Sequence, residues 1–289
     1  MKFIIVDSET YAAQFLINEK KSWCRENGVP FFKVDICDEK SIEELVIWYN
    51  IDTIVNFAAE SHVDNSIASP GVFYQTNVIG TKTLLEISRK RNIRFHQVGT
   101  DEVYGETRPD FWTENLVKSP ELAPIRPSSP YSASKVAADL AVLAWHRTYG
   151  LNVTVSRCTN NFGRWQHPEK LIGTVVSKAL RNEKIPVYGD GKQKRHWVHV
   201  DEHNRAILRI LEHGESGRIY NISPPRENWI ENIVLIRSIL RTLGKPESLI
   251  DHISDRLGHD VTYFLKGNGI SESRRIWSED MDDTVLWFR

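Results

Sequence analysis

Short apolar runs alternate with longer amphipathic stretches over roughly the first half of the chain. The short runs expected as strands, most of them apolar, cover residues 2–6, 31–34, 53–57, 94–98 and 153–156. Stretches with helical spacing cover residues 12–26, 41–49 and 70–91, and Ser41 and Glu44 are placed as a capping box for the second of them. Strands that alternate with helices predict an α/β fold with a doubly wound, Rossmann-like parallel sheet.

The pattern becomes irregular after about residue 160, where proline and glycine interrupt the apolar runs. We therefore expect a Rossmann-like dinucleotide-binding domain over residues 1–158. Residues 159–289 are expected to form mainly a smaller, mixed C-terminal substrate lobe, with some segments returning to the first domain. A lobe of this kind beside the strand ends is a usual place for a ligand.

Composition narrows the class of protein. The chain has 289 residues, of which 40% are hydrophobic and 26% charged, with a formal net charge of -1. That balance gives no reason to expect nucleic acid or an anionic membrane as a partner. No apolar run is long enough to span a membrane, and the start is too short and too soon polar for a secretion signal. Cys24, Cys37 and Cys158 are widely spaced, which favours reduced thiols and a cytoplasmic location.

One candidate for chemistry is the pair Tyr131 and Lys135. Ser128, Ser129 and Pro130 precede it and favour a helix start, so the spacing of four places both side chains on one helix face. An ammonium beside a phenol favours the phenolate, which can then act as a general base. The alternative is an ordinary pair on a surface helix.

A second candidate is Thr100-Asp101-Glu102, which directly follows the short strand-like run of residues 95–99. The carboxyl ends of parallel strands are where open α/β sheets place their ligands, and two adjacent carboxylates suit the removal of water. The alternative is a solvated acidic turn in which Asp101 caps a short helix.

A metal site is a weaker hypothesis. His196, His199 and His203 have helical spacing, which can bind zinc. Residues 197–200, however, have the pattern of a strand, so the three rings need not converge. We predict no metal site.

Taken together, these motifs resemble those of the extended short-chain dehydrogenase/reductases, and within them the nucleotide-sugar 4,6-dehydratases. The matching segments are residues 35–38, 57–64, 76–81, 100–105, 131–135, 157–163, 166–172, 186–191, 220–222 and 256–260. Adjacent acidic residues such as Asp101 and Glu102 separate these dehydratases from the related 4-epimerases, which lack the pair.

The resemblance implies conversion of a nucleotide-diphosphate hexose, such as dTDP-glucose or a UDP-sugar, to its 4-keto-6-deoxy form with bound NAD. Tyr131 would take the proton of the 4-hydroxyl group, and Lys135 would lower the pKa of Tyr131 and bind the nicotinamide ribose. Thr100 would hydrogen-bond the C4 oxygen. Glu102 would remove the C5 proton, and Asp101 would protonate the departing 6-hydroxyl group.

The resemblance also implies which residues hold the ligands. The cofactor would contact Asp35, Ile36, Ala58, Ala59, Ser61, Thr76, Tyr131, Lys135 and Asn161. The nucleotide sugar would contact Asn160, Lys170, Leu171, Pro186, Tyr188, Arg195, Asn221, Arg256 and His259. The helices around residues 70–91 and 131–149 match the pair that forms a homodimer interface in the family.

The chain departs from the family after its first apolar run. The family has a glycine-rich turn there, which lets the backbone approach the cofactor pyrophosphate. Here the run continues into Asp7-Ser8-Glu9, and the first glycine is Gly28. This predicts weaker or altered NAD binding. Two alternative functions therefore stay open, a catalytically impaired nucleotide-sugar-binding relative and a nucleotide-sugar epimerase.

Overall fold

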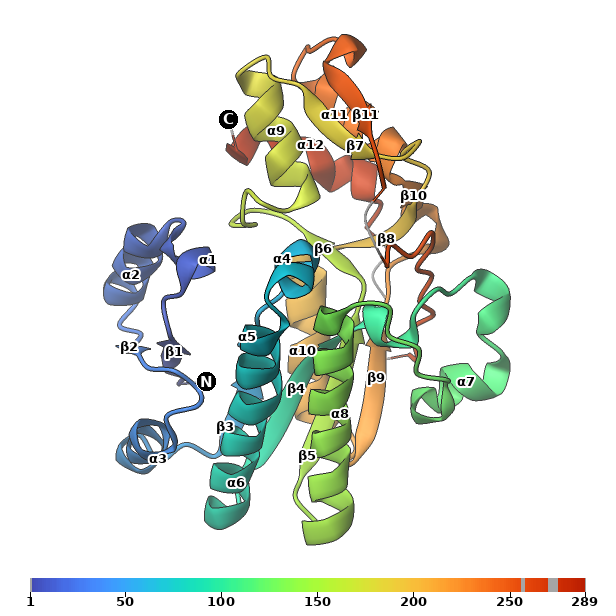
Figure 1. Ribbon diagram of the computed structural model, residues 1–289. Coiled ribbons are helices and arrows are strands. Elements are labelled where there is room, and N and C mark those ends of the chain that lie inside the picture. Colours follow the sequence, from blue (N-terminus) through green and yellow to red (C-terminus); the bar gives the residue numbers. More distant parts are fainter. Residues whose placement is uncertain (1, 256–257, 270–274, 289) are drawn as a thin grey trace. The chain divides into compact units, whose positions relative to one another are not determined.

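The computed structural model describes residues 2–255, 258–269 and 275–288 (Figure 1). Its strands are β1 (Ile5–Asp7), β2 (Phe31–Lys33), β3 (Thr53–Asn56), β4 (Arg94–Thr100), β5 (Val153–Cys158), β6 (Asn160–Phe162), β7 (Ile185–Tyr188), β8 (Lys194–His199), β9 (Arg218–Ile222), β10 (Trp229–Glu231) and β11 (Ile250–Ile253). Its α-helices are α1 (Tyr11–Gln14), α2 (Ile17–Glu26), α3 (Glu39–Trp48), α4 (Val63–Ala68), α5 (Pro70–Tyr74), α6 (Thr81–Arg91), α7 (Glu114–Lys118), α8 (Pro130–Tyr149), α9 (Leu171–Leu180), α10 (Val200–His213), α11 (Asn232–Thr242) and α12 (Trp277–Phe288).

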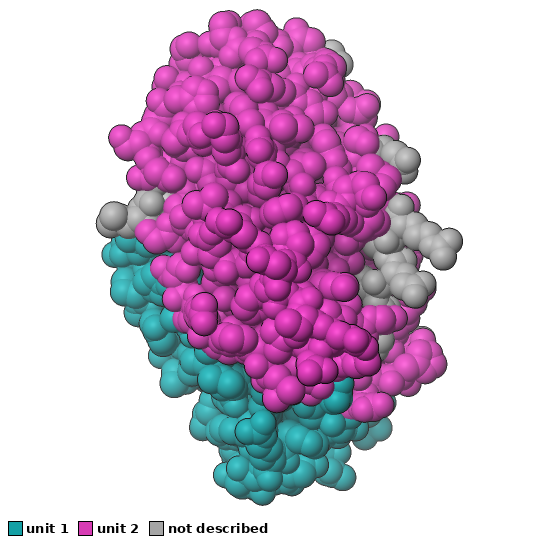
Figure 2. Space-filling model, turned by 90° about the vertical axis from the view of Figure 1, so that its right-hand side faces the viewer, with its two compact units in different colours: residues 1–98, 129–155, 216–218 teal, residues 99–128, 156–215, 219–289 magenta. Residues whose placement is uncertain are grey.

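The chain divides into two compact units, each built from several stretches of sequence (Figure 2). Unit 1 comprises residues 1–98, 129–155 and 216–218. Unit 2 comprises residues 99–128, 156–215 and 219–289. Strands β4, β5 and β9 therefore begin in unit 1 and end in unit 2.

The main sheet has the strand order β3-β4-β5-β9, and β3 pairs with β4 in parallel. Strands β1 and β2 form a separate parallel pair, with Ile5 opposite Phe31. Strand β5 is buried along its whole length, whereas all three residues of β1 are half-buried. The parallel strands and the crossover helices between them confirm the predicted α/β, Rossmann-like fold class.

Two of the predicted helices differ in detail from the observed ones. The single helix expected over residues 12–26 is wrong, because Leu16 has a φ of 58° and this left-handed residue separates α1 from α2. The predicted capping box of Ser41 and Glu44 is also wrong. Asp38 is the N-cap, and its carboxylate accepts the backbone N–H of Ser41.

The other predicted helices are observed. Residues 70–91 are helical throughout as α5, the π-helical segment Gln75–Gly80, and α6. Helix α8 begins as the serines and Pro130 predict: the Ser129 hydroxyl accepts the backbone N–H of Ser132, and the Ser132 hydroxyl accepts that of Ser129. This reciprocal capping fixes the start of the helix that carries Tyr131 and Lys135.

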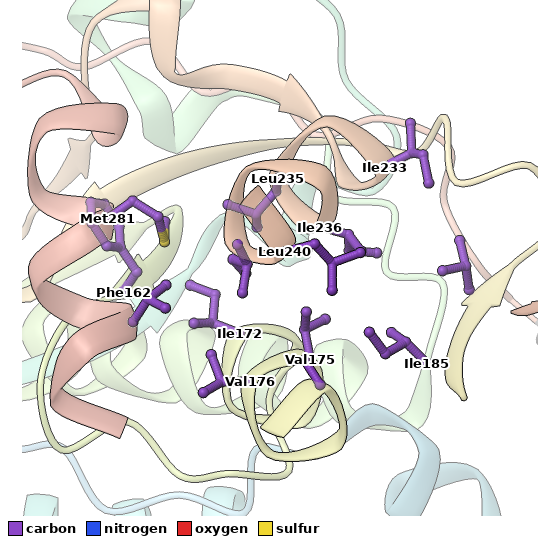
Figure 3. Close-up of a cluster of buried hydrophobic side chains, with 14 of the residues drawn as sticks. Phe162, Ile172, Val175, Val176, Ile185, Ile233, Leu235, Ile236, Leu240 and Met281 are labelled. Atoms are coloured by element: carbon purple, nitrogen blue, oxygen red, sulfur yellow. The ribbon is translucent and has the colours of Figure 1, made fainter. Parts of the chain in front are cut away.

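Unit 2 holds a mixed sheet with the order β10-β8-β6, in which β8 is antiparallel to β10 and parallel to β6. A parallel pair of strands, β7 and β11, lies in the same unit. The core of unit 2 is an apolar cluster contributed by α9, α11, α12 and these strands, with Ile172, Val175 and Leu235 fully buried (Figure 3). The mixed character expected of the second half of the chain is confirmed.

Within the described part of the chain, no helix combines the length and the apolar character needed to cross a membrane.

Candidate active site

The phenol and ammonium of the predicted hydride site lie on one face of α8 in unit 1. Tyr131 is 8% exposed and Lys135 is 4% exposed. The Lys135 Nζ atom donates a hydrogen bond of 2.7 Å to the backbone oxygen of Val98 on β4. Burial lowers the pKa of Lys135, and the charge of Asp139, one helical turn further on, opposes that shift. A buried ammonium with two N–H groups beyond the one on Val98 is suited to bind hydroxyl groups of a ribose.

A buried amide, which sequence reasoning did not single out, supports this face of α8. Asn77 donates hydrogen bonds to the Ser134 hydroxyl at 2.8 Å and to the Glu60 backbone oxygen at 3.0 Å. Its own oxygen accepts the backbone N–H of Glu60 at 2.9 Å. Ser134 in turn donates to the backbone oxygen of Tyr131 at 2.6 Å. Asparagine disfavours a helix interior, so Asn77 in a helical run is the signal that could have found it.

The remaining cofactor candidates of unit 1 lie at three places. Asp35 and Ile36 form the turn after β2, where Ile36 packs so closely on Gly80 that a β-carbon there would come within 2.4 Å of it. Ala58, Ala59 and Ser61 follow the carboxyl end of β3, and the two alanines are half-buried. Thr76 is half-buried in the π-helical segment.

The turn after β1 does not fit a cofactor pyrophosphate. The Asp7 carboxylate accepts the backbone N–H of Glu9 at 2.7 Å, which turns that amide inward. The Glu9 carboxylate forms ion pairs with Lys21 and Lys33, and these lysines lower its pKa. Asp7 thus occupies a backbone N–H group that a pyrophosphate would need, and its carboxylate adds negative charge where an anion would lie. The buried Lys135 ammonium on α8 fits the nicotinamide ribose of NAD, whereas the turn after β1 does not fit its pyrophosphate.

The acidic pair lies in unit 2, immediately after β4. Thr100 is the N-cap of a short 3₁₀ helix (Asp101–Tyr104), and its hydroxyl accepts the backbone N–H of Glu102 at 3.3 Å. The alternative in which Asp101 caps this turn is therefore wrong. Asp101 is 4% exposed, whereas Glu102 is half-buried. Gly105 ends the turn with a φ of 68°, a conformation that favours glycine.

The two neighbouring carboxyl groups have different environments. Burial, and then the charge of Glu102, raise the pKa of Asp101 to about 8, although Arg195 and the Thr100 hydroxyl act in the opposite direction. The Asp101 Oδ2 atom is buried without a hydrogen-bond partner among the described residues. Asp101 is therefore protonated at neutral pH, as a proton donor must be.

Arg195 lies close to the acidic pair and holds a nearby loop. Its guanidinium donates to the backbone oxygens of Lys194, Asp260 and Val261, and it lies 4.4 Å above the ring of Tyr263. The Tyr263 hydroxyl donates to Asp260 at 2.5 Å. Burial and the charge of Glu102 raise the pKa of Tyr263. Arg195 thus places a positive charge where it acts on Asp101 and Tyr263.

Three substrate candidates are grouped at the parallel pair β7 and β11. The rings of Tyr188 and His259 pack edge to face, with centroids 5.7 Å apart, and His259 Nδ1 lies 2.6 Å from an Asp255 carboxylate oxygen. Pro186 is exposed on β7. Arg256, also predicted to contact the nucleotide sugar, lies outside the described residues.

The other substrate candidates lie on different elements of unit 2. Asn160 begins β6, Lys170 is the N-cap of α9, and Leu171 is its first residue. Asn221 on β9 is fully buried and accepts the Tyr104 hydroxyl at 2.8 Å. Because Tyr104 belongs to the turn that carries the acidic pair, this hydrogen bond ties Asn221 to that turn. The Arg157 guanidinium lies 4.8 Å from the centre of the Tyr104 ring.

The three histidines considered for a metal have separate partners. His196 lies 3.0 Å from the backbone oxygen of Pro225, His199 caps α10 through Asp201, and His203 lies 2.9 Å from the side chain of Asn161. Residues 194–199 are a strand, in agreement with the sequence pattern, although Val200 begins α10. Among the described residues, no group of three or more histidine, cysteine or acidic side chains is placed to hold a metal.

The chain is similar in sequence to proteins of a known family. The family described as the NAD dependent epimerase/dehydratase family matches residues 1–223. A dTDP-glucose 4,6-dehydratase from Mycobacterium tuberculosis is 39% identical over 270 residues, which are 91% of this chain and 79% of that protein. A protein of the same name from Haemophilus influenzae is 38% identical over 317 aligned residues, with 99% of this chain and 90% of that protein covered.

A solved structure gives the same result for the fold. The dTDP-glucose 4,6-dehydratase of Streptomyces venezuelae, in a structure with bound NAD, has a TM-score of 0.90 and 39% sequence identity to this chain. The comparison covers 100% of this chain and 87% of that one.

Proposed function

Because this chain belongs to the NAD-dependent epimerase/dehydratase family, we propose that it is a nucleotide-sugar 4,6-dehydratase. It converts a nucleotide-diphosphate hexose, such as dTDP-glucose or a UDP-sugar, to the 4-keto-6-deoxy derivative. The observation that carries this proposal is the pair of adjacent carboxyl groups directly after β4, of which Asp101 is buried, with its pKa raised by burial and by the charge of Glu102, and Glu102 is half-buried. Relatives named for the dTDP-glucose reaction, which share 38–41% identity with the chain, support it.

The residues of α8 serve the oxidation at C4. NAD, when bound, supplies the acceptor that takes a hydride from C4 of the sugar and returns it at C6. Tyr131 takes the proton of the 4-hydroxyl group, and the Lys135 charge favours the phenolate that does so. Thr100 hydrogen-bonds the C4 oxygen. Asp35, Ile36, Ala58, Ala59, Ser61, Thr76 and Asn161 join Tyr131 and Lys135 in holding the cofactor.

The acidic pair serves the removal of water. Once C4 is a ketone, the proton on C5 is acidic, and Glu102 removes it and returns it to C5 when C6 is reduced. Asp101 gives its proton to the 6-hydroxyl group, which leaves as water. The two roles need opposite protonation states, and burial of Asp101 beside the more exposed Glu102 separates the two carboxyl groups in that sense.

The nucleotide diphosphate is held by residues of unit 2. Tyr188 and His259, whose rings pack together, are suited to contact the base or ribose. Asn160, Lys170, Leu171, Pro186, Arg195, Asn221 and Arg256 complete the set that the resemblance implies. The charge of Lys170 at the start of α9 is suited to a phosphate oxygen.

A homodimer and a cytoplasmic location belong to the same proposal. Helices α5 and α6 each pack on α8 in unit 1. The π-helical segment that joins α5 to α6 packs with them. Val72, Ile79 and Leu140 are 50%, 46% and 51% exposed, which is apolar surface that a second copy would cover. Cys24, Cys37 and Cys158 are free thiols, which supports a reducing compartment.

A direct test is product analysis with purified protein. Incubation with dTDP-glucose, UDP-glucose and UDP-N-acetylglucosamine, followed by mass spectrometry, should show loss of one water from one of them. The variants Asp101→Asn and Glu102→Gln should abolish that product, while Asp190→Asn, which changes an exposed carboxylate paired with Lys192, should not. Full activity of both site variants would contradict the proposal.

The same samples separate the two alternatives. A protein that binds the nucleotide sugar but carries no NAD is the catalytically impaired relative, and the carboxylates after β1 are the feature that favours it. A product of unchanged mass with inverted configuration at C4 identifies an epimerase. Mass spectrometry of the material that co-purifies with the protein decides the first point.

A further inference from the structure

His203 on α10 has no role in the proposed reaction, yet it is buried in contact with a cofactor candidate. It is 6% exposed, and its Nδ1 atom lies 2.9 Å from the Oδ1 atom of Asn161 on β6. Strands β6 and β8 are parallel neighbours, and α10 follows β8 directly. The fold therefore brings the His203 ring against the Asn161 amide.

The hydrogen bond fixes the tautomer of the ring. Burial lowers the pKa of His203 to about 4, so the imidazole is neutral at physiological pH and carries one N–H. An amide oxygen only accepts hydrogen bonds, so Nδ1 carries the proton. The Nε2 atom is then a bare acceptor, and it is buried without a hydrogen-bond partner among the described residues.

The rest of the Asn161 side chain is also held. Its Nδ2 atom donates to the Thr159 backbone oxygen at 3.1 Å and lies 3.7 Å from the Cys158 sulfur. Its backbone oxygen accepts the Gln166 amide at 2.8 Å. Burial and then the charge of Asp101 raise the pKa of the Cys158 thiol, so this network lies within electrostatic reach of the catalytic acid.

We infer that His203 is a positioning residue for Asn161: its Nδ1–H group holds the amide oxygen and so decides which end of the amide the cofactor meets. The inference rests on the proposed function, because it takes Asn161 as a cofactor contact. The two ends of an amide have nearly the same shape but opposite hydrogen-bonding character, so rotation by 180° would present a donor where an acceptor belongs. Without Nδ1–H, only the contacts of Nδ2 with Thr159 and Cys158 would hold the orientation.

Three substitutions at one position separate positioning from simple packing. In His203→Asn, the amide nitrogen takes the place of Nδ1, so the donor is kept. In His203→Gln, the amide nitrogen falls near the place of Nε2, so the donor to Asn161 is lost while a polar side chain remains. His203→Leu removes both the donor to Asn161 and the polar side chain. His213→Asn, on the exposed end of the same helix, is the matched control.

The measurements are the NAD dissociation constant by calorimetry, kcat and KM for the nucleotide sugar, and the ring tautomer by ¹⁵N NMR. We expect His203→Gln and His203→Leu to weaken NAD binding by about tenfold or more and to lower kcat, because misplacement of a contact group costs that much. KM for the sugar should change little. The NAD dissociation constants and kcat values of His203→Asn and His213→Asn should stay within about threefold of the wild type, because His203→Asn keeps a hydrogen-bond donor of the same kind and His213 lies away from Asn161.

Two controls complete the design. The wild-type spectrum should show the Nδ1–H tautomer for His203, and adding His203→Leu to Asn161→Ala should weaken NAD binding no further. The inference would be overturned if His203→Leu and His203→Gln bound NAD as tightly as the wild type. It would also be overturned if His203→Asn bound NAD as weakly as those two variants. A wild type that binds NAD but forms no dehydrated product would refute the proposed function and leave this comparison of affinities intact.

Discussion

Replacement of Asp101 by asparagine should stabilise the protein more at high pH than at low pH. Burial and the charge of Glu102 raise the pKa of Asp101 from 3.8 to about 8. Between these two values the folded protein holds a proton that the unfolded chain releases, so the stability that Asp101 contributes is complete below about pH 4 and is lost as the pH rises towards 8. Asparagine does not titrate, so its contribution is constant.

The magnitude follows from linkage. One extra bound proton changes the free energy of unfolding by about 1.4 kcal/mol per pH unit. The difference between Asp101→Asn and the wild type should therefore grow by roughly 3 kcal/mol between about pH 5 and pH 7, and level off above about pH 8.

Urea unfolding of both proteins at several pH values measures this difference directly. Asp190→Asn is the control: its carboxylate is exposed and paired with Lys192, which lowers the pKa of Asp190. A difference for Asp101→Asn that stays constant from about pH 5 to pH 7 would refute the reasoning, because Asp101 would then be ionised in the folded protein. A difference in unfolding free energy that does not change with pH reports only the contacts of the new amide.

Three other predictions follow from the same structure. Turnover of the wild type should fall as the pH rises through about 8, where Asp101 loses the proton that it must donate, and a pH–rate profile of kcat measures this. Gly105→Ala should cost about 1–3 kcal/mol more than Gly28→Ala and should also lower kcat. Both glycines have positive φ, but a β-carbon at Gly105 would lie 2.1 Å from the Arg126 oxygen, whereas none lies within 4 Å at Gly28; chemical denaturation of both variants decides. Ile172→Ala in the core of unit 2 should cost about 2–5 kcal/mol, and Leu180→Ala at the exposed end of the same helix much less, by the same assay.

Much of the fold was predictable because it depends on local pattern. The strand that ends at Thr100 follows from its short strand-like run between turn signals, and the helix that starts at Pro130 follows from serine capping chemistry. The break at Leu16 could not be predicted in this way, because leucine favours helices and its left-handed conformation comes from its surroundings. The cap at Asp38 was missed because Asp38 and Ser41 both fit an N-cap, and only the backbone decides between them.

The candidate site was predictable as a set of residues but not as a set of contacts. The motifs name Asp101 and Glu102, but burial, which separates the pKa of Asp101 from its ordinary value, is a tertiary property. Asn77 and His203 act on predicted site residues through hydrogen bonds between distant parts of the sequence. The predicted functional boundary at residue 158 stays a prediction. The compact units are interleaved, because β4, β5 and β9 each contribute to both.

The separate β1-β2 pair has a consequence for how the protein opens. Strand β3 has β4 as its strand partner, and within the described residues its other edge pairs with no strand. The residues of β1 and β2 are at most half-buried, so they contribute little apolar burial. Native-state hydrogen exchange should therefore show the β1-β2 pair opening as a separate, less protected unit, while the fully buried β5 exchanges only on global unfolding. Limited proteolysis should begin in that same segment.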